Sequence, residues 1–146
     1  MRRQGLPVPM SIPELAVQIK NVPGQLVQIT TILAEAGVNI QGITASSAGK
    51  TGWVRAVVDK AKLAEEALEE CGISVETGEA VAVLMTDEPG ALDRALRILA
   101  DEKINLDYIY TCVPAARQDK VVAVLGVQTP GRVEKLLKNN GIEIVE

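Results

Sequence analysis

The sequence predicts an α+β protein made of two consecutive β-α-β-β-α-β units, an arrangement called ferredoxin-like, with antiparallel sheets side by side and helices on one face. Two observations support this. A six-residue phrase occurs twice, as residues 21–26 (NVPGQL) and 87–92 (DEPGAL), each time between an alternating apolar segment and a helical pattern. At the resulting offset of 66 residues, 10 of the 30 positions from Glu14 to Ile43 are identical. Random pairing would give about two, so the chain contains an internal duplication.

The first unit follows from apolar periodicity and from glycines that end helices. Its expected elements are, in order, a strand over 14–20, a helix between Asn21 and Gly37, a strand over 38–47, a turn over 48–52, a strand over 53–58, a helix between Asp59 and Gly72, and a strand over 73–76. Asp59 is expected to cap the second helix, whose apolar face is predicted to comprise Leu63, Ala67, Leu68 and Cys71.

The second unit repeats this order. Its expected elements are a strand over 80–86, a helix over 89–103, strands over 104–112 and 120–128, a helix over 130–140, and a strand over 142–145. Thr129 and Pro130 begin the last helix with a capping residue followed by proline. The predicted division is an N-terminal arm over 1–13, a first domain over 14–78 and a second over 79–146.

Composition excludes several classes of protein. No stretch approaches the ~20 apolar residues of a membrane helix, and the first residues lack the apolar core of a signal peptide, so we expect a cytoplasmic protein without a membrane partner. The net charge is −4, the pI is near 5.0, and the 15 lysines and arginines are scattered. Nucleic acids are therefore not expected as partners. RNA binding on an open sheet would also need stacking aromatic residues, and aromatics are only 2% of the chain.

Catalysis and metal binding are not expected either. The chain has no histidine, which removes the commonest general base and the commonest metal ligand. Cys71 and Cys112 do not form a CxxC pair, and buried packing roles are expected for both. A ferredoxin-like fold can also be an acylphosphatase, but that activity needs an arginine in a phosphate-binding loop, and the first loop has none. We predict a non-enzyme without a cofactor.

The Pro-Gly junctions are the candidate binding points. A helix that begins at such a corner presents N–H groups and the positive end of its dipole, which suit a carboxylate. Gly24 and Gly90 are placed in the first helical turn, where glycine costs about 1 kcal/mol relative to alanine, so a close approach by a ligand or by another backbone is indicated. Asn21 and Asp87 have a purely structural alternative as helix N-caps.

The uncovered sheet face of the second unit is predicted to be an interface. If Ile109 faces the helices, an exposed apolar patch should form from Leu84, Tyr108, Tyr110, Val122 and Val124. The corresponding positions of the first unit are smaller or more polar: Gln18, Gly42, Thr44, Trp53 and Arg55. The two faces are therefore expected to differ in role, with a homodimer formed mostly through the second unit.

The repeated pattern resembles the ACT domain, an amino-acid-sensing module, over residues 14–146. The resemblance rests on an apolar strand, Asn/Asp-x-Pro-Gly-x-Leu, an amphipathic helix and the Gly37–Ile40 segment. In that family the ligand lies between two units, held by the first strand-to-helix loop and the start of the second strand. The resemblance implies these ligand-binding residues: Asn21, Val22, Gly24, Gln25, Leu26, Asn39, Ile40, Asp87, Gly90, Ala91, Leu92, Asn105 and Leu106.

The implied function is a regulatory protein that binds a small-molecule amino acid and signals to a partner enzyme or transcription factor. The second unit departs from the family pattern, because Asp87 replaces Asn21 and Lys103 replaces Gly37. A carboxylate at Asp87 would repel the carboxylate of an amino acid but could hold its ammonium, so equal occupancy of two sites is not expected. The alternative function is an assembly module that binds no ligand.

Overall fold

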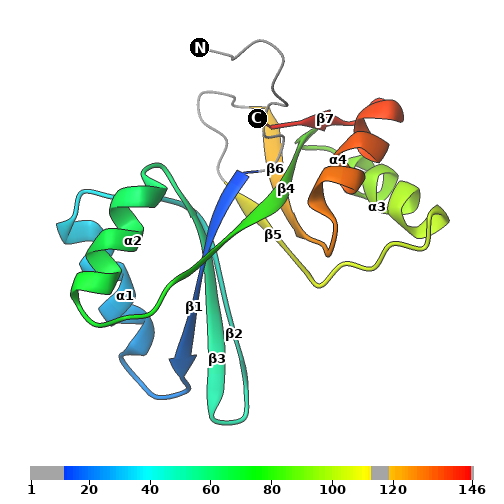
Figure 1. Cartoon of the computed structure of the whole chain (residues 1–146). Coiled ribbons are helices and arrows are strands. Elements are labelled where there is room, and N and C mark those ends of the chain that lie inside the picture. The colour runs from blue at the N-terminus through cyan, green and yellow to red at the C-terminus, as the bar shows by residue number, and fades with distance from the viewer. Residues whose placement is uncertain (1–11, 113–118, 146) are drawn as a thin grey trace. The chain divides into compact units, whose positions relative to one another are not determined.

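The computed structural model describes residues 12–112 and 119–145 (Figure 1). The chain divides into two compact units. Among the described residues, what we call the first unit comprises 13–78 and 110–112, and the second comprises 79–109 and 119–145, together with Ile12.

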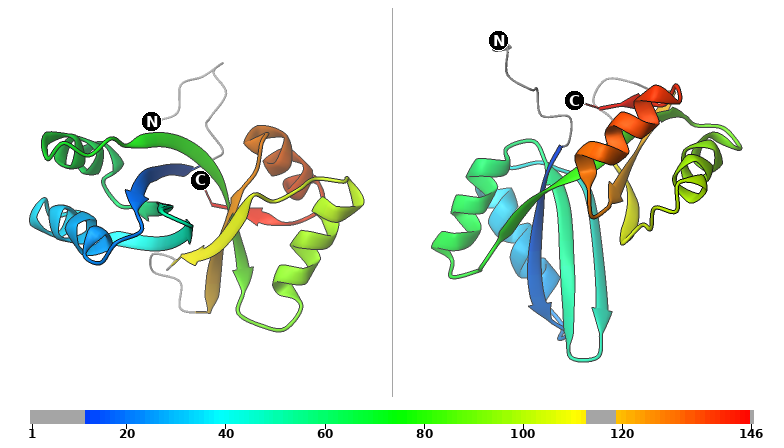
Figure 2. Two further views of the ribbon diagram at one scale, coloured as in Figure 1. Left: turned by 90° about the horizontal axis from the view of Figure 1, so that it is seen from below. Right: turned by 45° about the vertical axis from the view of Figure 1, so that its right-hand side comes forward.

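The first unit has helices on one face of an antiparallel sheet (Figure 2). Its elements are β1 (Ile12–Lys20), α1 (Gln25–Glu35), β2 (Ile40–Ala48), β3 (Thr51–Val58), α2 (Ala61–Glu70) and the beginning of β4 (Glu76–Thr86). The strand order is β2-β3-β1-β4, and β1 pairs with β3 from Leu15↔Ala56 to Lys20↔Thr51. The core forms where α1 and α2 pack on this sheet, around buried Leu33 and Leu68.

The second unit repeats this plan. It contains the rest of β4, α3 (Ala91–Asp101), the beginning of β5 (Tyr108–Cys112), β6 (Lys120–Gly126), α4 (Pro130–Asn139) and β7 (Glu143–Ile144). The strand order is β5-β6-β4-β7, and its core is centred on Leu99, Leu125 and Leu137. The predicted fold class, α+β with four helices and ferredoxin-like antiparallel units, is confirmed.

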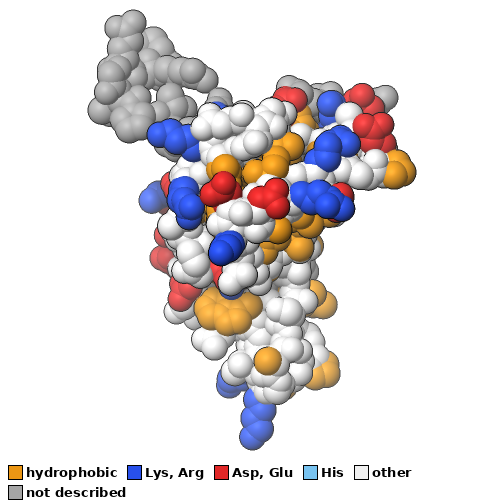
Figure 3. All heavy atoms as spheres, turned by 90° about the vertical axis from the view of Figure 1, so that its right-hand side faces the viewer, with side chains coloured by type: hydrophobic (Ala, Val, Ile, Leu, Met, Phe, Trp, Pro, Cys, Tyr) orange, Lys and Arg blue, Asp and Glu red, His pale blue; other side chains and the backbone are white. Residues whose placement is uncertain are grey.

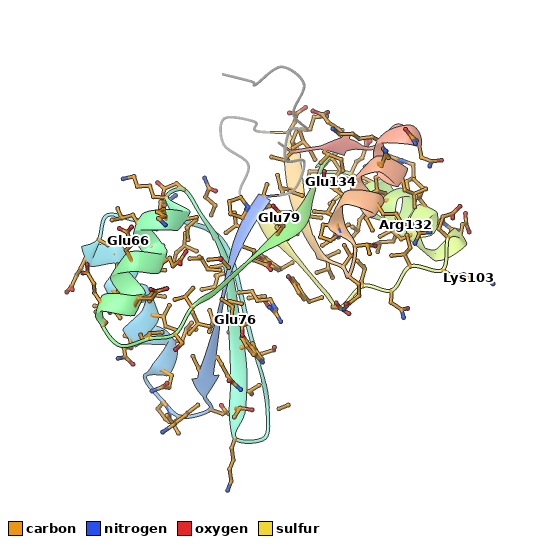
Figure 4. All side chains as sticks on the ribbon, viewed as in Figure 1. Glu66, Glu76, Glu79, Lys103, Arg132 and Glu134 are labelled. Carbon is orange, nitrogen blue, oxygen red and sulfur yellow. The ribbon has the colours of Figure 1, made fainter. Side chains whose placement is uncertain are left out.

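All four helices end in the same backbone motif. After α1, the N–H of Gly37 bonds to the carbonyl of Ala34 and the N–H of Val38 bonds to that of Leu33, which is the Schellman pattern. Equivalent pairs of bonds follow α2, α3 and α4. The predicted closures at Gly37 and Gly72 are confirmed, whereas at α3 the left-handed position is held by Lys103, with φ of 57° (Figure 4).

Four local predictions for the first unit were wrong. Residues 73–75 form no strand, because β4 begins only at Glu76. Asp59 does not cap α2; its Oδ1 instead accepts a hydrogen bond from the backbone N–H of Asn39 at 2.9 Å. Leu63 is 40% exposed, because the packed stripe of α2 lies one residue further on, at Ala64 and Leu68. Cys71 at the end of α2 is also exposed rather than buried.

The exposed apolar patch predicted on the second unit was also wrong. Leu84, Tyr110, Val122 and Val124 are each no more than 9% exposed, and Ile109 is the exposed member at 39%. The Tyr110 hydroxyl donates a 2.6 Å hydrogen bond to the carboxylate of Glu14, itself buried, within the first unit. The predicted exposed patch is therefore not present among the described residues, and the homodimer stays a prediction.

Candidate functional site

The junction between β1 and α1 turns at Gly24. This residue is the N-cap of α1 and has φ of +89°, and a Cβ built there would meet nothing within 4 Å. The left-handed backbone, which disfavours side chains, is therefore the reason for glycine here. Gly24 is the N-cap and does not lie in the first helical turn as predicted, and no other backbone of the described residues approaches it; close approach by a ligand stays a prediction. Gly90 has the same role before α3, with φ of +88°.

Asn21 does not cap α1. Its backbone N–H donates to the carbonyl of Lys50 at 2.8 Å, and its side-chain Nδ2 donates to that of Gly49 at 3.0 Å. These two bonds tie the junction to the β2–β3 hairpin turn. In the second unit the backbone N–H of Asp87 makes the matching bond to the carbonyl of Asp119 at 3.2 Å, so Asp87 is not the N-cap of α3 either.

The first turn of α1 is consequently available to a ligand. No side chain caps this helix, and the earliest bond within it runs from the N–H of Gln28 to the carbonyl of Gly24 at 3.0 Å. The N–H groups that precede Gln28 lie at the positive end of an 11-residue helix. Such an end favours a negatively charged partner.

A cavity of about 230 Å³ lies beside this helix end, and we call it the junction pocket. It is lined by residues 19–22, 24–27 and 45–47. Five residues predicted as ligand-binding line it: Asn21, Val22, Gly24, Gln25 and Leu26. The sequence analysis missed the contribution of β2, namely Ala45, Ser46 and Ser47.

Within the first unit, Asn39 and Ile40 do not line the junction pocket. They stand at the beginning of β2, where both the N–H and the carbonyl of Asn39 are bonded to Asp59. β1 and β2 run parallel on either side of β3, so the end of β1 lies beside the end of β2. Six residue steps of about 3.3 Å separate Ile40 from Ser46, or about 20 Å along the strand. This topology could have predicted Ser46 as a lining residue.

The corresponding residues of the second unit serve its fold more closely. Ala91 is only 5% exposed, and Leu92 and Leu106 pack against the core of that unit. Asp87, Gly90 and Asn105 are exposed. The two junctions are therefore unequal, because more of the candidate ligand-binding residues pack into the core in the second unit.

The junction of the first unit carries unusually exposed apolar side chains. Val22, Leu26 and Val27 are 51%, 39% and 64% exposed, and all three line the junction pocket. Leu26 stands outside the buried face of α1, which Ile29 and Leu33 supply. Exposed apolar side chains clustered at one loop are typical of a surface that binds something.

A second cavity, of about 480 Å³, lies on the other side of the same junction, and we call it the edge cleft. It is lined by residues 17–20 of β1, by Gln25, Gln28 and Ile29 of α1, by Thr51, and by residues 72–74. Its far wall lies where a strand over 73–76 was predicted. The missing strand pairing is what leaves room for the cleft.

The electrostatics of both cavities are simple. Among the described residues that line them, Lys20 is the one charged side chain, and it borders both.

Away from the two cavities, the pKa of Arg97 is raised by its hydrogen bond to Asp93, 2.7 Å away on the same helix, and by the charge of that carboxylate. Figure 3 shows acidic and basic side chains intermixed on the face that it presents.

Two other kinds of site are not found in the described part of the chain. Residues 12–112 and 119–145 contain no cluster of three or more histidine, cysteine, aspartate or glutamate side chains that could hold a metal ion. Within the same ranges no helix is both long enough and apolar enough to span a bilayer.

Comparison with known proteins identifies the family. The chain aligns with protein BT0572 from Bacteroides thetaiotaomicron at 22% identity and a TM-score of 0.83, covering 93% of this chain and 92% of that one. The ligand-free regulatory subunit of aspartate kinase from Thermus thermophilus aligns at 16% identity and a TM-score of 0.63, covering 90% and 93%. Aspartate kinase from Synechocystis aligns at 21% identity and a TM-score of 0.60, covering 90% of this chain and 24% of that enzyme.

These likenesses show the fold. A search of curated proteins found no match. The family model of the ACT domain pair matches residues 10–146, nearly the whole chain. The chain therefore belongs to the family of ACT domain pairs.

Proposed function

We propose that this ACT domain pair is a regulatory protein that binds an amino acid in the junction pocket of its first unit. The observation that carries the proposal is the pocket itself, which lies beside an uncapped helix end and is lined by five residues that the resemblance had already implied. The α-carboxylate of the ligand would meet the first N–H groups of α1 and the Lys20 ammonium.

The rest of the pocket suits a small zwitterion with a modest side chain. Hydroxyl and amide groups of Ser46, Ser47 and Asn21 can accept hydrogen bonds from an ammonium group. Val22 and Leu26 offer apolar surface to an aliphatic side chain. The volume of about 230 Å³ favours a single amino acid over anything larger.

Regulation would follow from binding that favours one state of the protein over another. Solved structures with this fold include regulatory subunits of aspartate kinase, and we propose a partner enzyme or transcription factor for this chain as well. Asn39 and Ile40 could reach a ligand at the junction pocket only from another ACT unit. A homodimer, in which a second copy supplies them, is therefore part of the proposal.

A second candidate is an assembly module that binds no ligand. The exposed side chains of Val22, Leu26 and Val27 favour it, because an apolar cluster of this kind could equally pack against another protein chain. The two candidates differ in whether a free amino acid stabilises the protein.

A thermal-shift screen of the twenty amino acids tests the proposal. A ligand present at 100 times its Kd stabilises the folded state by about 2.7 kcal/mol, which raises the Tm of a chain of this size by about 5–10 °C. We expect such a shift with a small subset of the amino acids. The absence of a shift with any of them would favour the assembly module.

Two variants localise the effect. Ser46→Phe fills the junction pocket and is expected to abolish the shift. Ser74→Phe places the same bulk outside that pocket and should leave the shift unchanged. A shift that survives Ser46→Phe would show that the amino acid binds elsewhere.

A further inference from the structure

One wall of the edge cleft is the side of β1 that faces away from β3. Residues 15–20 of β1 pair with β3 on one side, and residues 17–20 border the cleft. β4, the other neighbour of β1, begins only at Glu76, and the far wall of the cleft is residues 72–74. In an antiparallel ladder, successive residues direct their N–H and carbonyl groups to opposite neighbours. Half of the main-chain groups along this stretch therefore point towards the cleft.

The dimensions of the edge cleft fit a short extended chain. Four strand residues span about 10 Å at about 3.3 Å per residue, which is also the length of an extended tripeptide. The volume of about 480 Å³ falls within the range of about 300–1,000 Å³ that is typical of small-ligand sites. The junction pocket is half that size, so the two cavities would take ligands of different length.

The charge of the cleft favours a ligand with a negative end. Lys20 stands at the end of β1, and among the described lining residues it alone is charged. Amide and hydroxyl side chains make up most of the remaining polar lining, including Gln28 on α1 and Ser74 on the far wall. Apolar contacts are available from Ile29 and Ile73, one on each side of the cleft.

We propose that the edge cleft binds the carboxyl-terminal end of an extended peptide of about three residues. The peptide adds to the open side of β1, so that main-chain hydrogen bonds give affinity and the apolar walls give side-chain preference. Its terminal carboxylate pairs with the Lys20 ammonium. The edge cleft and the junction pocket share Ile19, Lys20 and Gln25 in their walls, so a bound peptide and a bound amino acid would compete for the Lys20 ammonium.

Titration calorimetry on the full chain with the tripeptide Ala-Val-Ala tests the proposal. We expect saturable binding, and we expect the C-terminal amide of the same peptide to bind at least about tenfold more weakly, because it lacks the charge that meets Lys20. The variant Lys20→Met should remove the difference between the acid and the amide. Equal binding of both peptides to the unaltered chain would overturn the proposal.

Two matched variants distinguish this site from the junction pocket. Ser74→Phe fills the cleft from its far wall and should weaken the tripeptide at least about tenfold, whereas Ser46→Phe should not. Gln28→Leu is the second test should Ser74→Phe lose its native circular dichroism spectrum. Failure of the tripeptide to bind, or binding unaffected by Ser74→Phe and Gln28→Leu, would exclude the edge cleft. Neither result would alter the amino-acid screen.

Discussion

Lys103 occupies a backbone position that glycine holds at the other three helix ends. Its φ of 57° lies in the left-handed region, which costs a residue with a side chain roughly 1–2 kcal/mol. The hydrogen bonds that follow α3 are nevertheless the same as those that follow α1. The bonding pattern of the Schellman motif is thus retained at some cost in backbone energy.

Replacement of this residue should stabilise the protein. Lys103→Gly removes the left-handed penalty and loses part of that gain to the greater freedom of glycine in the unfolded chain, for a net gain of about 0.5 kcal/mol. Urea denaturation monitored by circular dichroism would measure it. The matched control is Gly37→Lys, the reverse exchange at the end of α1, which should destabilise by a similar or larger amount. A loss of stability in Lys103→Gly would contradict this interpretation.

Asn21 illustrates what single residues do not reveal. Its type and place before a helix predict an N-cap, and that prediction depends only on neighbours in sequence. In the structure the side chain of Asn21 donates to the carbonyl of Gly49, 28 residues away, and its backbone N–H donates to the carbonyl of Lys50, 29 residues away. A hairpin turn that folds back to the end of β1 cannot be read from the local pattern.

The packing of β5 on β6 in the second unit depends on the lack of a side chain at Gly126. A Cβ at this position would overlap the ring of Tyr108, and the carbonyl of Gly126 accepts a 2.8 Å bond from the N–H of Asp107. The ring therefore lies directly over the backbone at the end of β6. Gly126 therefore cannot gain a side chain unless the ring of Tyr108 or the strand moves.

Gly126→Ala should therefore destabilise the protein by about 1–3 kcal/mol, the usual cost of overpacking. The double variant Tyr108→Ala/Gly126→Ala should cost less than the sum of the two single variants, because the clash no longer exists. Chemical denaturation of the four proteins in this cycle measures the coupling. Strict additivity would show that the ring does not constrain Gly126.

Helices and strands with strong apolar periodicity were predicted well, whereas the strands and residues that they contact were predicted less well. The internal repeat gave the order of strands and helices in both units because apolar spacing reports which face of an element is buried. The segment 73–75 was mistaken for a strand, since an alternating apolar pattern does not show whether a neighbouring strand lies within reach. The burial of Glu14 and Glu134 was not predicted; the carboxylate of Glu14 accepts its hydrogen bond from Tyr110, 96 residues away in the sequence.

The molecule as a whole is a duplication whose halves have diverged in their surfaces. The first unit exposes Val22, Leu26 and Val27 beside its junction, whereas Leu92, which corresponds to Leu26, packs against the core of the second unit. Five of the candidate ligand-binding residues in the first unit were gathered around one cavity, and Asn39 and Ile40 were not. The resemblance to a family could not indicate which unit would supply each part of a site.

We expect one amino acid, not two, to bind per chain. The carboxylate of Asp87 would repel that of a ligand at the second junction, and Ala91 is already buried there. Titration calorimetry with the amino acid identified in the screen gives the stoichiometry. The control is Asp87→Asn, which removes the repulsion and restores the residue type found at position 21. Two equivalent sites in the unaltered chain would refute the inequality of the units.

The thiol of Cys71 is exposed, at the end of α2, one residue before the wall of the edge cleft begins at Gly72. Cys112 is partly buried, so a maleimide dye will react first at Cys71. A fluorophore attached there would sit at the rim of the cleft and change its emission when the cleft is filled. Cys71 is thus a natural attachment site for an optical reporter. With the dye attached there, an unlabelled peptide library could be screened without altering any residue that lines the cleft.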